Sequence, residues 1–266
     1  MTTITTGRSY IVTGAGSGIG LATAQLLRER GATVIGVDLK GAEVQGDLST
    51  AEGRVAAAEA ALELTGGSVD AVIACAGISA PIPLTASVNF FGVTQFLDHL
   101  APALAKSASP RAAVVSSMAS LQANSPEQVA AMLAGDEALA VEIGTALAAQ
   151  GPQAGYLNYS SSKRALSRWV RRESIAPRYA GAGIPLNAVA PGTVISAMTE
   201  KLLSTPEGRA MVDANVPMPL NGHSEAMVIA RLLVWLTSEE NTHTTGQIIY
   251  ADGGADATLR GDDIWA

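Results

Sequence analysis

The sequence contains very little cysteine, few aromatic residues and few charged residues. Cys75 is the only cysteine among 266 residues, so no disulfide can form within the chain and nothing indicates an oxidising compartment. Aromatic residues make up 4% and charged residues 15% of the chain, whereas hydrophobic residues make up 48%. This composition is typical of a packed α/β protein with a core of Ala, Val, Leu and Ile, and not of a disordered chain.

Other features are also absent, and each absence narrows the possible functions. The net charge is -7 and no long block of Lys and Arg is present, so nucleic acid is not an expected partner. The chain has no apolar run of about 18 residues, and residues 1–7 lack a basic start and an apolar stretch. We therefore expect no membrane span and no signal peptide, which favours a cytoplasmic protein. His99, His223 and His243 lack the spacing of metal ligands, so no metal is expected.

Short β-rich runs alternate with longer Ala-rich helical stretches. The expected strands are Tyr10–Val12, Val34–Val37, Ala71–Ala74, Ala112–Ser116, Leu186–Ala190 and Ile248–Tyr250, and a helix is expected at Leu21–Arg30. The strands are almost continuously apolar, which is typical of parallel strands covered by helices on both faces. The pattern predicts an α/β fold with a Rossmann-type, doubly wound parallel sheet in a single domain over residues 1–266.

One segment, residues 119–156, interrupts this alternation because it has no strand signal. Its apolar residues Leu139, Ile143 and Leu147 recur every four residues and share one helix face. Capping signals for two successive helices are present at Ser125, Pro126, Gln128, Gly135 and Asp136. The segment is therefore predicted to be a helical insertion packed against the main domain, in preference to a flexible loop.

A glycine-rich turn, TGAGSGIG at residues 13–20, lies directly between the first strand and the first helix. Such a turn needs residues that tolerate positive φ, and a dinucleotide pyrophosphate needs a backbone without Cβ atoms to approach the helix N-terminus. Gly14, Gly18 and Gly20 occupy the positions of the turn at which these two requirements apply. A tight turn alone would also explain the glycines, but the flanking strand and helix favour nucleotide binding.

An acidic residue, Asp38, ends the second strand, 24 residues beyond Gly14. A carboxylate there can accept hydrogen bonds from both adenosine ribose hydroxyls and repels a 2′-phosphate. Lys40 is the nearest cation, two residues beyond the acid. The sequence favours NAD over NADP, although Asp38 alone could simply be a solvated strand end.

Tyr159 and Lys163 are four residues apart in the run YSSSK, so on a helix they would share a face. An ammonium and the positive ring of an oxidised nicotinamide would both stabilise the phenolate, which lets a tyrosine act as general acid/base. Alone, this spacing would more often mark an exposed helix face. Ser117 follows an expected strand and could bind the substrate oxygen. Asn89, inside an apolar helix, could bridge Lys163 to water or simply pack.

The motifs of this chain and their order resemble those of the short-chain dehydrogenase/reductase family, and the resemblance covers nearly the whole chain. They are the glycine-rich turn, Asp47-Leu48, Ala74-Cys75-Ala76-Gly77, Asn89, Ser117, Tyr159 with Lys163, Asn187, Pro191-Gly192 and Asp252-Gly253-Gly254. The resemblance implies an NAD-dependent alcohol dehydrogenase or carbonyl reductase that needs no metal.

The resemblance also implies roles for individual residues. The implied catalytic residues of this chain are Ser117, Tyr159, Lys163 and Asn89. The implied cofactor-binding residues are Gly14, Ser17, Gly18, Ile19, Asp38, Leu39, Asp47, Leu48, Ala76, Gly77, Tyr159, Lys163, Pro191, Gly192, Val194 and Ser196. Within this set, Asp47 and Leu48 would hold the adenine, Lys163 the nicotinamide ribose, and Val194 and Ser196 the carboxamide.

The chain departs from the family pattern in three places. Ala74 and Cys75 replace two asparagines, which puts in doubt the hydrogen bonds that fix that strand, and Gly77 lies unusually close to Asn89. In addition, 41 residues separate Ser117 from Tyr159, where the helical insertion lies. The insertion and the run over residues 42–49 resemble the bacterial 3α-hydroxysteroid dehydrogenase/carbonyl reductase subgroup.

The residues expected around the substrate are mainly apolar. They are Ser117 and, if the segment after residue 192 folds as a lid, Met118, Tyr156, Met198, Leu202 and Leu203. This wall predicts a bulky hydrophobic secondary alcohol or its ketone, such as a 3α-hydroxysteroid or an aryl or terpenoid ketone. Ordinary core packing would also explain these residues.

Two other functions are compatible with these motifs. A xenobiotic carbonyl reductase acting mainly on aryl-alkyl ketones would carry the same residues. A catalytically idle nucleotide-sensing scaffold is a different class, and the intact Ser117, Tyr159 and Lys163 disfavour it. We also expect a homodimer or homotetramer in which the insertion covers the helix face beside Tyr159, so that assembly uses residues 226–235 and the last strand.

Overall fold

The apolar runs of the sequence form a seven-stranded sheet in the computed structural model, which describes residues 5–264. The strands are β1 (Ser9–Thr13), β2 (Thr33–Asp38), β3 (Val44–Gln45), β4 (Ala71–Ala74), β5 (Arg111–Val115), β6 (Leu186–Pro191) and β9 (Ile248–Ala251). Their order is β3-β2-β1-β4-β5-β6-β9 and every neighbouring pair is parallel. The order reverses between β1 and β4, so the predicted doubly wound fold is confirmed.

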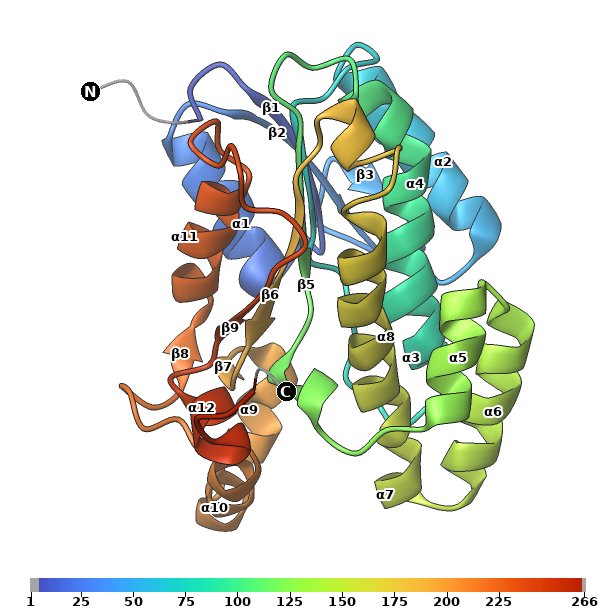
Figure 1. Ribbon diagram of the computed structural model, residues 1–266, viewed down its shortest axis with the longest axis vertical. Coiled ribbons are helices and arrows are strands. Elements are labelled where there is room, and N and C mark those ends of the chain that lie inside the picture. The colour runs from blue at the N-terminus through green and yellow to red at the C-terminus, as the bar shows by residue number, and fades with distance from the viewer. Residues whose placement is uncertain (1–4, 265–266) are drawn as a thin grey trace.

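Helices cover both faces of the sheet (Figure 1). On one face lie α1 (Gly18–Glu29) and α11 (Ala226–Leu236), and on the other lie α2 (Ala51–Leu64), α4 (Gly92–Leu104) and α8 (Leu157–Glu173). Each layer has its own apolar cluster: Leu27 and Ile229 belong to the first, and Phe96 and Leu166 to the second. Burying each such side chain contributes roughly 1.5–3 kcal/mol. The two clusters therefore hold the carboxyl ends of the strands in a fixed register.

The insertion contains two capped helices, α5 (Pro126–Ala134) and α6 (Glu137–Ala149), followed by the short α7 (Pro152–Gly155). The Ser125 hydroxyl accepts a hydrogen bond from the Gln128 N–H at 3.2 Å. Gly135 ends α5 with φ of 79°, and the Asp136 carboxylate accepts from the Leu139 N–H at 3.0 Å. The predicted helices and their caps are confirmed, because these signals act within one turn of the chain.

The face through which α6 packs differs from the one that the apolar periodicity indicates. Ala140 and Gly144 are buried, whereas Leu139 is 42% exposed. A Cβ atom at Gly144 would overlap the side-chain oxygen of Asn158 and would lie 2.7 Å from the Gln128 amide nitrogen. The helices thus approach so closely that only small residues fit, and the face bearing Leu139, Ile143 and Leu147 is turned partly toward solvent.

Hydrogen bonds attach the insertion to the first turn of α8. The Asn158 amide donates to the Gly144 carbonyl at 3.1 Å, and the Ser160 hydroxyl donates to the Ala123 carbonyl at 2.6 Å. These two residues flank Tyr159. The insertion therefore helps to fix the position from which the Tyr159 side chain projects.

Smaller elements gather beyond the carboxyl ends of the strands (Figure 1). They are α9 (Ala197–Leu203), α10 (Pro206–Asn215), α12 (Ala255–Arg260) and the two-stranded parallel sheet of β7 (Val194–Ile195) and β8 (Ser224–Glu225). The short α3 (Leu84–Ala86), a π-helical turn at Ser87–Phe91 and 3-10 turns at Met118–Leu121 and Ala180–Ala182 complete the secondary structure over residues 5–264. None of the helices in this range has the length and apolar character needed to cross a membrane.

The close approach at Gly144 leads to a stability prediction. Replacing Gly144 with Ala favours helix formation by up to about 1 kcal/mol in a free helix, but here the added methyl must push α6 away from Asn158. We expect Gly144→Ala to lower the Tm, at a net cost of about 1 kcal/mol or more. Calorimetry should show no such loss for Thr145→Ala, at the exposed neighbouring position. A Tm above that of the wild type for Gly144→Ala would contradict the close packing.

Candidate active site

A single cavity of about 1280 Å³ extends along the carboxyl ends of the strands. Of the predicted site residues, Asn89 and Leu203 are not part of its wall; those in the wall include Gly14, Ser17, Gly18, Ile19, Asp38, Leu39, Asp47, Leu48, Ala76, Gly77, Pro191, Gly192, Val194 and Ser196. Pockets for one drug-sized ligand measure roughly 300–1,000 Å³. The cavity therefore has room for a dinucleotide and a second bulky molecule.

The glycine-rich turn brings three backbone segments close together at one part of this cavity. Gly14 has φ of 69°, and a Cβ atom there would lie 2.9 Å from the backbone nitrogen of Ala76. A Cβ atom at Gly20 would overlap the Gly14 carbonyl. Helix α1 begins at Gly18, three residues earlier than predicted, because the end of the turn is already helical. The turn thus brings a helix N-terminus to the cavity, with glycines where the backbone segments approach most closely, which fits a pyrophosphate.

The Asp38 carboxylate is held at the end of β2 by two backbone groups. One oxygen accepts a hydrogen bond from the Gly16 N–H at 3.0 Å, and the other accepts from the Leu39 N–H at 2.7 Å. Each carboxylate oxygen can accept a further bond. Asp38 lines the cavity, so a fixed acceptor pair faces the space that a ribose would occupy, as the dinucleotide interpretation requires.

Asp47 and Leu48 lie farther along the same wall. A hydrogen bond from Ser49 lowers the pKa of the Asp47 carboxyl, so this exposed group stays charged at neutral pH. Leu48 is buried, with 6% of its surface exposed. The pair therefore combines an acceptor with an apolar contact, which suits the edge and face of an adenine.

The strand that lacks the two family asparagines is fixed by another residue. The Ala76 N–H donates to the Thr13 hydroxyl at 3.1 Å, which joins the end of β4 to the end of β1. Burial raises the pKa of the Cys75 thiol to about 12, so this group stays neutral near Lys163. Thr13 therefore supplies a hydrogen bond at the end of the strand where Ala74 and Cys75 replace the two asparagines.

Ser117 and Tyr159 both line the wall of the cavity. Burial raises the pKa of the Tyr159 phenol above its usual value, and the nearby Ser117 hydroxyl only partly opposes this. The Ser117 hydroxyl accepts a hydrogen bond from the Ala119 N–H at 3.1 Å, as the cap of the 3-10 turn at Met118–Leu121. In the protein alone, the phenol is therefore protonated and the Ser117 side chain is oriented.

Lys163 places a buried cation beside the phenol. Its side-chain nitrogen donates to the Val115 carbonyl at 2.8 Å and lies 5.9 Å from the centre of the Tyr159 ring. Burial lowers the pKa of Lys163 to about 8. At pH 7 the ammonium form still predominates, so one positive charge is available next to Tyr159.

Asn89 lies behind this pair in the π-helical turn and is fully buried. Its amide donates to the Ile78 carbonyl at 2.9 Å and to the Ser162 hydroxyl at 3.1 Å, while its oxygen accepts from the Ile78 N–H at 2.8 Å. The side chain therefore packs and holds the loop before it. A catalytic role of Asn89 through water toward Lys163 stays a prediction.

Helices α9 and α10, the segment expected to form a lid, contribute apolar side chains to the cavity wall. Met198 and Leu202 are in the wall and are 51% and 40% exposed, and Tyr156, also in the wall, is 46% exposed. Met118 also lines the cavity and is almost fully buried. Leu203, in contrast, is buried and does not line the cavity, so its predicted contact with the substrate is wrong.

Several wall residues had no signal in the sequence. They include Leu121, Gln153, Met211, Val212, Leu259 and Arg260, from the insertion, α10 and α12. Their segments carry no motif and reach the cavity only through the tertiary fold. Among residues 5–264, Arg260 is the one charged side chain in the wall apart from Asp38, Asp47 and Lys163.

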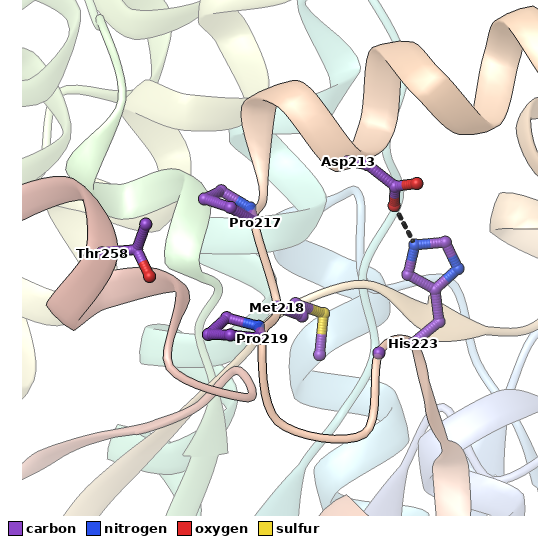
Figure 2. A pocket seen from close by; sticks show the side chains of 7 residues that line it. Asp213, Pro217, Met218, Pro219, His223 and Thr258 are labelled. Carbon is purple, nitrogen blue, oxygen red and sulfur yellow. Dashed lines mark hydrogen bonds and ion pairs between the residues drawn. The ribbon is translucent and has the colours of Figure 1, made fainter.

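A smaller hollow of about 500 Å³ lies beside the lid, next to Met218 and Thr258 (Figure 2). Here His223 pairs with Asp213 at 2.8 Å, which joins α10 to the loop before β8 (Figure 2). His99 and His243 are exposed. Over residues 5–264, no three His, Cys, Asp or Glu side chains lie close enough together to hold a metal ion.

Comparisons with known proteins agree with this geometry. A family model described as Enoyl-(Acyl carrier protein) reductase matches residues 14–256. The chain is 35% identical over 255 residues to the 3-alpha-hydroxysteroid dehydrogenase/carbonyl reductase of Comamonas testosteroni, and the alignment covers 94% of this chain and 97% of that protein. It is 29% identical over 263 residues to the coniferyl-alcohol dehydrogenase of Pseudomonas sp. (strain HR199), and this alignment covers 95% of this chain and 98% of that protein. Among solved structures, the 3-alpha-hydroxysteroid dehydrogenase from Pseudomonas sp. B-0831 complexed with NADH matches with a TM-score of 0.86 and 36% sequence identity. The match covers 96% of this chain and 100% of that chain.

Proposed function

The chain belongs to the short-chain dehydrogenase/reductase family, and on that premise we propose that it is an NAD(H)-dependent oxidoreductase of bulky hydrophobic secondary alcohols and their ketones. One observation carries the proposal. Ser117, Tyr159 and Lys163 line the same cavity as the glycine-rich turn and the apolar lid. A cofactor bound along the turn and a substrate bound under the lid would therefore both reach these three side chains.

The residues of this site suit proton transfer to and from a carbon-bound oxygen. When bound, the nicotinamide ring supplies or accepts the hydride. Tyr159 donates a proton to the ketone oxygen in reduction and accepts the hydroxyl proton in oxidation. Ser117 holds that oxygen and stabilises the negative charge that it gains. Lys163, whose side-chain nitrogen lies 5.9 Å from the centre of the Tyr159 ring, favours the phenolate through its positive charge and would also bind the nicotinamide ribose.

The substrate class follows from the chemistry of the apolar part of the cavity wall. Met118, Met198 and Leu202 give an apolar and adaptable wall. The Comamonas relative is named for a 3-alpha-hydroxysteroid and the Pseudomonas relative for coniferyl alcohol, and both names describe hydroxyl compounds with a large apolar part. We therefore propose a 3α-hydroxysteroid-like alcohol or an aryl or terpenoid ketone as substrate.

Removing the Tyr159 hydroxyl tests the proposed function. Tyr159→Phe should lower turnover of a steroid, aryl or terpenoid ketone by about 100-fold or more, because proton transfer by a positioned side chain contributes about that much. NADH binding, followed by fluorescence, should be retained. Tyr179→Phe is the control, since its hydroxyl bonds to Asp98 outside the cavity. Wild-type turnover by Tyr159→Phe would refute the assigned acid/base role.

Asp38 supports the choice of NAD over NADP. The wild type should use NADH at least about 10-fold more efficiently than NADPH, because like charges a few Å apart repel by several kcal/mol near a protein surface. Asp38→Ala should narrow this ratio by improving use of NADPH. Asp47→Ala removes an equal charge from the same wall and should weaken NADH use without helping NADPH. Equal efficiency of the wild type with both cofactors would contradict the proposal.

The outer surface of α11 supports the expected homo-oligomer. Val228 is 49% and Trp235 37% exposed on this helix, and β9 forms the last strand of the sheet beside it. We propose that two copies pair through α11 and β9. Trp235→Glu should then lower the mass measured by light scattering, whereas Ile175→Glu, at a 75% exposed site elsewhere, should not. A monomeric wild type would exclude this assembly.

A further inference from the structure

Arg54, the fourth residue of α2, is a charged side chain enclosed in the core. Only 1% of its surface is exposed. A guanidinium without partners in such a place would be strongly destabilising. Its partners therefore show what the buried charge holds together.

Three of these partners are backbone carbonyl groups. The guanidinium donates to the carbonyl of Leu48 at 2.8 Å, to that of Ser49 at 3.0 Å and to that of Ser87 at 3.2 Å. Leu48 and Ser49 belong to the wall of the cavity where the adenine would bind. Ser87 begins the π-helical turn that contains Asn89. Arg54 thus links Leu48 and Ser49, which would contact the adenine, to the π-helical turn that contains Asn89.

The charge of Arg54 is balanced by the insertion. Both oxygens of Glu137, in the first turn of α6, accept from the guanidinium at 2.6 and 2.7 Å. Gln95 adds a neutral contact at 3.0 Å. Over residues 5–264, Glu137 is the only carboxylate bonded to Arg54. This bidentate pair therefore joins a helix of the insertion to the adenine part of the cofactor cavity.

We propose that Glu137 is a positioning residue for the cofactor, acting through Arg54 on the segment Asp47–Ser49. The inference rests on the proposed function, since it assigns this segment to adenine. Without the carboxylate, Arg54 must admit water or turn outward, because a buried and unpaired charge is costly. The carbonyls of Leu48 and Ser49 then lose their donors, and the adenine wall loosens. The reacting groups Ser117, Tyr159 and Lys163 make no contact with Arg54 and keep their geometry.

The test compares two glutamate substitutions on one helix. Glu137→Gln removes the charge that pairs with the buried Arg54, whereas Glu142→Gln removes an exposed charge from the same helix. Calorimetry measures the affinity of each variant for NADH and for ADP-ribose, which has the adenine and pyrophosphate but no nicotinamide. Glu137→Gln should weaken both ligands by the same factor, about 5-fold or more, the usual lower range of coupling between sites. Turnover at saturating NADH should stay at the wild-type value.

A second readout needs no ligand. Amide hydrogen exchange over residues 46–50 should be faster in Glu137→Gln than in Glu142→Gln or the wild type, because the segment has lost its anchor. If Glu137→Gln folds poorly, the double variant Arg54→Met with Glu137→Gln leaves no unpaired charge. It should fold and still bind ADP-ribose weakly, since Leu48 and Ser49 remain without donors.

Two results would overturn the proposal. One is wild-type affinity of Glu137→Gln, or of the double variant, for both ligands, even if the Tm is lower, because Glu137 would then serve stability alone. The other is an equal loss of affinity in Glu142→Gln. If the wild type itself binds neither NADH nor ADP-ribose, the proposed function fails first, and the role of Glu137 fails with it.

Discussion

Burying a lysine ammonium costs free energy, and at Lys163 the carbonyl of Val115 offsets part of that cost with a hydrogen bond of 2.8 Å. Val115 is the last residue of β5, so the cation can be held there only if β5 and α8 keep their relative position. The core between the sheet and α8 fixes that position through Leu166 and Val170, which are fully buried. The phenol of Tyr159 gains a positive neighbour only because this packing is rigid.

Helix α8 receives a second set of constraints from the insertion. Its serines between Tyr159 and Lys163 are all engaged: Ser160 bonds to Ala123, Ser161 accepts from the N–H of Ser125, and Ser162 accepts from Asn89. Asn158 adds contacts to α6. Polar groups on this helix would otherwise need water as their hydrogen-bond partner. The insertion therefore supplies partners for polar side chains and closes that side of the site with protein.

The site could be predicted from the sequence to the extent that local chemistry and strand topology determine it. Residues at strand ends, such as Asp38 and Ser117, line one cavity because parallel strands present their carboxyl ends on one edge. The caps of α5 and α6 depend on contacts within one turn. The packing face of α6 was not predictable, because the close approach of Gly144 to Asn158 depends on the tertiary fold. For the same reason the contributions of Met211 and Leu259 carried no signal, and neither did the Arg54–Glu137 pair.

Burial moves the two pKa values of the proposed catalytic pair in opposite directions. It raises that of Tyr159 and lowers that of Lys163 to about 8, so in both cases it disfavours the charged form. The neutral phenol is the form that donates a proton to a ketone, so the protein alone already holds Tyr159 in the state that reduction requires. Alcohol oxidation requires the phenolate, which one nearby ammonium does not stabilise enough to overcome burial. Under the proposed function, Tyr159 therefore becomes an effective base only when a second positive charge, that of an oxidised nicotinamide ring, lies close to the phenol.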